Sequence, residues 1–150
     1  MPNPVSSQPI TTSALDRAFT RADVEFHGVD HSGPSYEGRV YLNTPGADES
    51  TGVDAPGYAG SFFIFGHGGC LGDAGHCDVV PRRRFDPRPA HHLTPVRKVV
   101  IATEAIGRAL DSGADELVVT VVPVITSTSA EAGRPDDLLQ YQEVRVVTYR

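Results

Sequence analysis

The chain has 150 residues, a formal net charge of −6 and a hydrophobic fraction of 39%, which fits one domain with a single sizeable core. Its 15 glycines and 12 prolines indicate many turns and favour a loop-rich β protein over a helical one. The acidic balance argues against a nucleic-acid partner. There is no apolar run near the roughly 20 residues that span a bilayer and no secretory signal, so we expect a cytoplasmic protein that does not enter the membrane.

The start of the chain is rich in Pro, Ser and Thr, which predicts a flexible N-terminal arm over residues 1–20. A single domain follows over residues 21–150. Within it, alternating or β-branched runs bounded by turn residues are typical of strands. The predicted strands cover residues 23–29, 36–43, 60–65, 96–102, 116–125 and 141–149.

The first predicted strand alternates, with Val24 and Phe26 on one side and Glu25 and His27 on the other. This pattern predicts a strand with one solvated face. The third predicted strand carries a short aromatic run, and we expect its phenylalanines to anchor the loop that follows to the core. They are Phe62, Phe63 and Phe65.

One short helix is predicted over residues 104–110, with Thr103 as its N-cap and Gly113 as its stop. The run at residues 116–125 is so rich in β-branched residues that it predicts a buried strand. Pro123 inside this run indicates an edge or a bulge. Six or seven short strands with one short helix predict an all-β fold, an antiparallel β-sandwich.

A glycine-rich loop after the third predicted strand holds both cysteines and two of the six histidines, in the spacing H-x2-C-x5-H-C. Thiolate and imidazole together suit copper(I) or zinc, and four such groups complete a tetrahedral site. A later histidine pair could replace one of the four. The sequence therefore predicts a soft-metal site, with copper as the metal and zinc as the alternative. The candidate ligands are His67, Cys70, His76, Cys77, His91 and His92.

Other interpretations of this loop stay open. Cys70 and Cys77 could instead form a disulfide that stiffens a protein-interaction module, or remain buried thiols. A catalytic thiolate–imidazole pair is disfavoured, because catalytic Cys and His usually come from separate elements. A small metalloenzyme would keep one coordination position open for substrate or dioxygen, with His91 or His92 as a proton carrier. The sequence identifies no substrate pocket for such an enzyme.

The remaining basic and imidazole side chains have simpler interpretations. His27 lies on the polar side of a strand and His31 in a turn, so we expect both to be solvated. The run of arginines at residues 82–84 is flanked by prolines, which predicts a solvated loop.

Four segments occur in an order that carries a family resemblance: YEGRVYLN, YAGSFFIFGHG, VRKVVIATEAIGRAL and ADELVVTVVPV. In this succession the chain resembles, over residues 22–149, the C-terminal β-domain of tyrosinases and plant polyphenol oxidases. The resemblance implies a sandwich that sits over the entrance of a type-3 copper centre in a neighbouring catalytic domain. There it shields the centre or keeps the enzyme latent, and separate caddie proteins of bacterial tyrosinases help to load copper.

The chain departs from the complete enzymes of that family in its histidines. It has only six, and none has the helical spacing that two three-histidine copper sites require, so we expect no tyrosinase activity. The loop HGGC…GHC has no counterpart that we can map onto the plant domain. We therefore expect a non-catalytic β-domain that binds copper or zinc and serves a type-3 copper oxidase as accessory, shield or copper donor.

Overall fold

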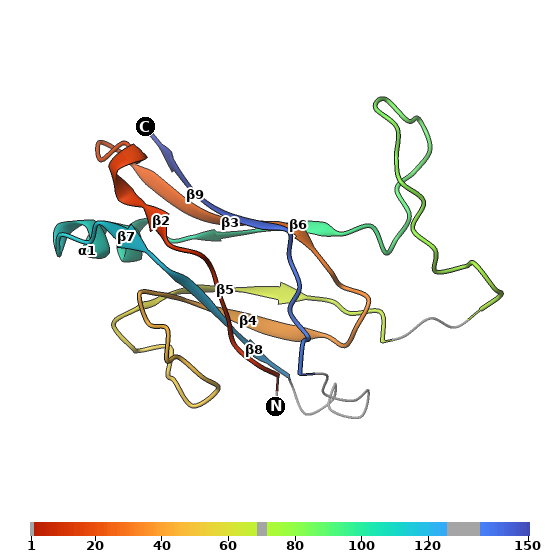
Figure 1. Cartoon of the computed structure of the whole chain (residues 1–150), viewed down its shortest axis with the longest axis horizontal. Helices are drawn as coiled ribbons and strands as arrows, with labels where there is room; N and C mark the ends of the chain where they lie inside the picture. The colour runs from red at the N-terminus through yellow and green to blue at the C-terminus, as the bar shows by residue number, and fades with distance from the viewer. Residues whose placement is uncertain (1, 69–71, 126–135) are drawn as a thin grey trace.

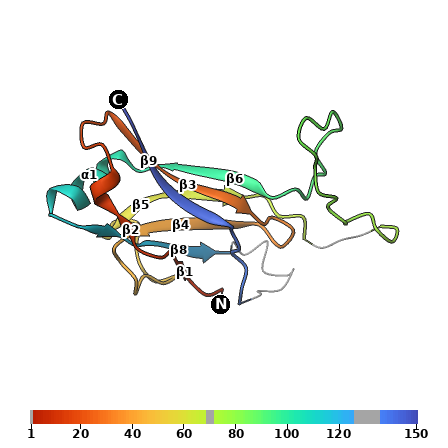
Figure 2. The ribbon, with the colours of Figure 1, turned by 45° about the horizontal axis from the view of Figure 1, so that its top comes forward.

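The protein is a two-layer β-sandwich, described by a computed structural model over residues 2–68, 72–125 and 136–150. One sheet has the strand order β1-β8-β4-β5 and the other β6-β3-β9, with β2-β7 as a short additional pair, and all pairings are antiparallel. The two sheets face each other around one core (Figures 1 and 2). The elements are β1 (Val5–Ser6), β2 (Ile10–Thr11), a 3-10 turn (Thr12–Ala14), β3 (Arg21–Val29), β4 (Tyr36–Leu42), β5 (Tyr58–Ile64), β6 (Val96–Ile101), α1 (Thr103–Asp111), β7 (Glu116–Leu117), β8 (Val119–Val124) and β9 (Glu143–Tyr149).

The predicted all-β sandwich with one short helix is confirmed. Among the described residues, no helix is both long enough and apolar enough to cross a membrane.

The aromatic run of β5 obeys the two-residue period of a strand, which corrects one expectation. Phe62 is buried in the core, where its ring lies 5.0 Å from that of Phe26. Phe63 and Phe65 are 66% and 84% exposed, because successive side chains of a strand point to opposite faces. Only Phe62 of the three therefore anchors β5, together with the buried Ile64.

The N-terminal segment, predicted as a flexible arm, is part of the sandwich instead. Val5 pairs with Val121 at the edge of β8, and Ile10 pairs with Leu117. Both apolar side chains pack against the core, and burial of apolar surface outweighs the local Pro, Ser and Thr preference for irregular structure. Composition could not reveal this, since only the fold provides the open strand edges.

The β-branched run is divided into β7 and β8 at Val118. The Val118 N–H donates to Asn43 Oδ1 at 2.7 Å, while the Asn43 N–H donates to the Val118 carbonyl at 2.8 Å. Pro123 lies opposite Gly38 on β4, and β1 covers only Thr120 and Val121 on the other side of β8. The end of β8 is thus an edge, as Pro123 indicated.

The polar side of β3 is buried, contrary to the solvated face that alternation predicted. Asp23 is 1% and Glu25 5% exposed. Because β3 is the central strand of its sheet, β6 brings Arg97 and β9 brings Tyr149 onto Glu25, and both donate hydrogen bonds to its carboxylate. His27, also expected to be solvated, is half-buried and bonds Glu25 through Nε2 at 2.9 Å.

The helix α1 closes one end of the sandwich (Figure 1). Thr103 is its first residue rather than its N-cap, and its Oγ1 accepts the Ala22 N–H at 3.1 Å. Gly113 ends the helix as predicted, with a positive φ of 83° and its N–H donating to the Leu110 carbonyl at 3.0 Å. The long connection from β5 to β6 projects from the opposite end (Figures 1 and 2).

Candidate functional site

The connection between β5 and β6, residues 65–95, is called the histidine loop here because it holds four of the six histidines. It leaves the sandwich beside the turn at residues 31–35, which joins β3 to β4. Gly66 makes this close approach possible, since a Cβ there would lie 2.1 Å from the Gly33 carbonyl oxygen. The Gly66 N–H donates to Ser35 Oγ at 2.9 Å, and the Gly68 N–H donates to the Gly33 carbonyl at 3.0 Å.

This attachment places His67 against His31. The backbone N–H of His67 donates to the His31 carbonyl at 3.2 Å, and His67 Nδ1 lies 3.3 Å from the same oxygen. The two ring centroids are 4.9 Å apart. His31 is only 9% exposed, and its Nε2 bonds the Thr94 carbonyl at 2.9 Å. The expectation that His31 is solvated is therefore wrong: it ties the turn to the returning part of the histidine loop.

The returning part of the loop is also tied to its outgoing part. His91 Nε2 bonds the His76 carbonyl at 2.9 Å, and His91 Nδ1 accepts the Leu93 N–H at 3.1 Å. Both ring nitrogens of His91 are thus engaged with backbone. The neighbouring His92 ring lies 4.4 Å from that of His91, 5.5 Å from that of His67 and 5.6 Å from that of His76.

Five histidines therefore meet at the end of the sandwich opposite α1, and we call them the histidine cluster: His31, His67, His76, His91 and His92. Desolvation, followed by the charge of the surrounding imidazoles, lowers the pKa of His92 below its ordinary value. At neutral pH this favours a neutral ring with a free lone pair. A ring nitrogen facing a carbonyl oxygen carries the hydrogen, so His31 keeps its lone pair on Nδ1 and His67 on Nε2.

Cys77, predicted as a thiolate ligand, is disulfide-bonded in this structure. A disulfide sulfur is not a thiolate, which is the form that binds soft metals. Cys70 lies outside the described residues. Within the described ranges, no three His, Cys, Asp or Glu side chains are already grouped so as to hold a metal ion.

The outer part of the histidine loop presents apolar and basic side chains to solvent. Phe85 is 88% exposed, and the Arg84 guanidinium lies 5.0 Å from its ring centroid. Arg82 Nη2 donates to the carbonyls of Asp86 and Arg88 at 2.9 and 2.7 Å. The arginine run is exposed, as the sequence predicted.

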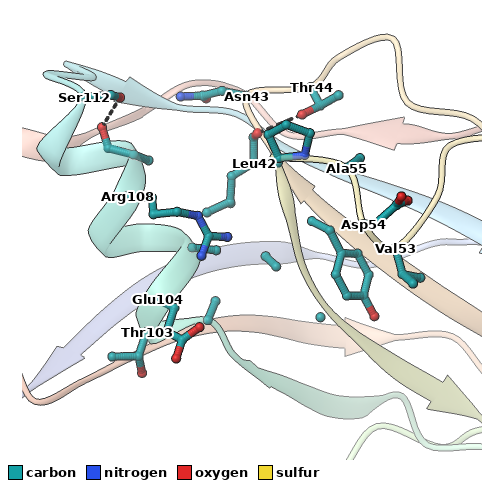
Figure 3. A pocket seen from close by; sticks show the side chains of 18 of the residues that line it. Leu42, Asn43, Thr44, Val53, Asp54, Ala55, Thr103, Glu104, Arg108 and Ser112 are labelled. Carbon is teal, nitrogen blue, oxygen red and sulfur yellow. Dashed lines mark hydrogen bonds between the residues drawn. The ribbon is translucent and has the colours of Figure 1, made fainter.

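An open groove of about 1020 Å³ lies at the other end of the molecule, between α1 and the segment joining β4 to β5 (Figure 3). Arg108 extends from the helix into it, facing Asp54 and Val53 across the groove. The Ser112 Oγ donates to the Ala109 carbonyl at 2.7 Å on the helix side. Sequence reasoning did not find this groove, because its two walls are distant in sequence. It contains none of the clustered histidines.

Comparison with known proteins gives matches at the level of structure. No protein-family model matches the sequence, and no curated protein matches it. Latent aurone synthase (a polyphenol oxidase) from its natural source has a TM-score of 0.56 and 15% identity, over 98% of this chain and 24% of that chain. The recombinantly expressed latent enzyme has a TM-score of 0.55 and 15% identity, over 99% of this chain and 25% of that chain.

This chain thus spans about a quarter of the length of the structures it matches. At 15% identity the likeness concerns the fold and not the activity. It agrees with the family that the sequence motifs suggested. The protein has, along almost its whole length, the fold of a β-domain found in latent polyphenol oxidases.

Proposed function

We propose that this chain is a non-catalytic β-domain of the tyrosinase and polyphenol oxidase type. It acts as an accessory to a type-3 copper oxidase, whose copper centre it shields or supplies with copper. The observation that carries the proposal is that nearly the whole chain matches about a quarter of an enzyme described as latent. We infer that a domain of this kind would restrict access to the catalytic site of such an enzyme.

The histidine loop is the part of the surface that we assign to the oxidase. Phe65 and Phe85 are more than 80% exposed on it, and Val80 is 62% exposed. Exposed apolar side chains of this size gathered on one segment are typical of protein-interaction surfaces. Aromatic and Arg side chains are also the types that contribute most to binding energy at interfaces.

We further propose that the same end of the molecule binds a soft metal ion, copper with zinc as the alternative. The proposal is supported by the predicted histidine ligands of this loop, since the His92 ring centroid lies 4.4–5.6 Å from those of His67, His76 and His91. In the disulfide-bonded state only the histidines are available, and reduction would add the Cys77 thiolate. A site beside the partner surface would be suited to exchange copper with the oxidase.

The test is to add the purified chain to a type-3 copper oxidase expressed without its own β-domain, and to follow catechol oxidation. A shield lowers the rate of the copper-loaded enzyme, and a copper donor restores the rate of the copper-depleted enzyme. A double variant, Phe65→Ser with Phe85→Ser, should lose either effect because it removes the exposed aromatics. Phe63→Ser is the matched control, because it removes an exposed aromatic of β5 that lies outside the histidine loop. No effect on either form of the oxidase would contradict the proposal.

The second candidate is an interaction module whose loop is braced by a disulfide, and the disulfide-bonded state of Cys77 favours it. Such a module binds its partner without metal. Its partner binding should weaken when the disulfide is reduced, whereas treatment with a chelator should leave it unchanged. Measuring association with the oxidase under both treatments separates this candidate from the copper-handling one.

A further inference from the structure

We propose that the metal site of this protein is built from imidazoles alone. His67 and His92 form its centre, His31 and His76 flank them, and the cysteines are not ligands. The inference depends on the proposed function for its choice of copper but not for the existence of the site. It also adds His31, which lies outside the loop that the sequence singled out.

The spacing of the rings is the first argument. Two imidazoles bound to one ion at about 2.0–2.1 Å in tetrahedral geometry have ring centres about 5 Å apart. The observed centroid distances are 4.9 Å for His31 and His67, 5.5 Å for His67 and His92, and 5.6 Å for His92 and His76. Neighbouring rings in this row are thus at ligand spacing, although no three of these side chains are grouped around one point among the described residues. His67, His76 and His92 are exposed, so their side chains have room to turn toward a common ion, which the proposed site requires.

The backbone contacts of the inner two rings are the second argument. Ligating histidines almost always donate their other ring N–H to a carbonyl, a carboxylate or water, which fixes the ring and raises its basicity. His31 donates in this way to the Thr94 carbonyl, and His67 to the carbonyl of His31. The lone pairs of His31 Nδ1 and His67 Nε2 are left for an ion.

The outer rings have uncommitted nitrogens, with one exception. Within the described part of the chain, the ring nitrogens of His76 and His92 make no hydrogen bonds, whereas both nitrogens of His91 are bonded to backbone. His91 is therefore a positioning residue that holds the two sides of the loop together. A buried hydroxyl, Thr94 Oγ1, also lacks a hydrogen-bond partner among the described residues. It belongs to the residue whose carbonyl accepts the hydrogen bond from His31 Nε2.

The chemistry of the donors indicates the metal. Imidazole nitrogens suit copper, zinc and nickel, and for a given set of nitrogen ligands Cu²⁺ binds more tightly than Zn²⁺. A site without thiolate also functions while Cys77 is in a disulfide. We therefore assign the site to Cu²⁺, with Zn²⁺ as a weaker competitor.

The experiment is a titration of the disulfide-bonded chain with CuCl₂. Calorimetry measures the affinity for Cu²⁺, and electron paramagnetic resonance reports its ligands. His67→Ala and His92→Ala should each weaken Cu²⁺ binding by about 10-fold or more, the range seen when even an outer partner of a metal ligand is removed. His31→Gln, which keeps a donor for Thr94, should weaken it similarly. His27→Ala is the matched control, because His27 lies on β3 and contacts Glu25. It should not change the affinity.

A double variant, Cys70→Ser with Cys77→Ser, decides between imidazole and sulfur ligation. The proposal requires that this variant still binds about one Cu²⁺ with the nitrogen hyperfine pattern of histidine ligands. Loss of binding in the cysteine variant, or unchanged binding in His67→Ala and His92→Ala, would overturn it. Circular dichroism of each variant shows whether the sandwich is intact. Failure of the oxidase assay with intact Cu²⁺ binding would contradict only the proposed function.

Discussion

Replacing Gly66 by alanine tests how the histidine cluster is assembled. The new Cβ would lie 2.1 Å from the Gly33 oxygen and 2.3 Å from the Pro34 carbonyl carbon, both backbone atoms, where an ordinary contact begins at 3.4 Å. The chain at residues 66–68 must therefore move away from the turn at residues 31–35. This movement breaks the hydrogen bonds from the Gly66, His67 and Gly68 N–H groups.

The size of the effect follows from these bonds. Three hydrogen bonds at about 0.5–1.5 kcal/mol each give a loss of about 1.5–4.5 kcal/mol in the stability of this attachment. Hydrogen exchange at the His67 and Gly68 amides should accelerate at least about 10-fold, since a factor of 10 corresponds to about 1.4 kcal/mol. Cu²⁺ binding should weaken with it, because His67 is displaced from His31. We expect both changes in one variant.

Two further variants calibrate the measurement. Gly46→Ala meets no atom within 4 Å and should leave exchange and Cu²⁺ binding unchanged. Ser35→Ala removes only the acceptor of the Gly66 N–H, at about 1 kcal/mol. If Gly66→Ala retains wild-type amide protection at His67, the close approach of the two segments is not what positions the cluster, and the reasoning fails.

Three other predictions concern stability, each measured by urea unfolding. Phe62→Ala should lower the free energy of unfolding by about 3–5 kcal/mol, because the ring is buried in the core. Phe65→Ala, on the exposed side, should change it by no more than about 0.5 kcal/mol. Equal losses in the two variants would contradict the assigned faces. Burial acts to raise the pKa of Glu25, but hydrogen bonds from His27 and Arg97 outweigh it and hold the pKa below its ordinary value. The folded state thus binds fewer protons than the unfolded state as pH falls below about 5, so the stability of the protein declines there as the carboxylate is protonated. In Glu25→Gln the free energy of unfolding should decline less steeply between neutral pH and pH 4. An unchanged slope of stability against pH would argue against this role of Glu25. Gly107→Ala in α1 meets no atom within 4 Å and should stabilise the protein by about 1 kcal/mol; destabilisation would show that the helix tolerates no side chain there.

The two ends of the molecule differ in what they offer a ligand. The groove beside α1 is an open hollow of about 1020 Å³, but the exposed side chains of Arg108 and Glu104 make no hydrogen bond or ion pair there with any described residue. At the other end, three imidazoles of the histidine cluster are held by backbone carbonyls on three separate chain segments. Convergence of oriented ligands is a stronger indication of chemistry than volume is. The histidine cluster is therefore the better candidate for a binding site.

The sequence by itself determined the properties that follow from local chemistry. Period-two alternation identifies the core side of β3, where Val24 and Phe26 are fully buried. The β-branched run identifies β8, and Gly113 identifies the end of α1. The concentration of His, Cys and Gly after β5 marks the histidine loop as a candidate site, and metal binding there stays a prediction. These signals are local because strand period, helix termination and turn conformation each depend on a few neighbouring residues.

Tertiary structure decided everything that depends on which strands are neighbours. Glu25 is buried because β6 and β9 flank β3, and the first residues of the chain are ordered because β8 and β7 have edges to pair with. His31 joins the cluster because Tyr36 pairs with Ile64, so the residues before β4 and after β5 emerge side by side. Composition and period carry no information about pairing between distant segments, and it is pairing that brings the His31 ring centroid within 4.9 Å of that of His67.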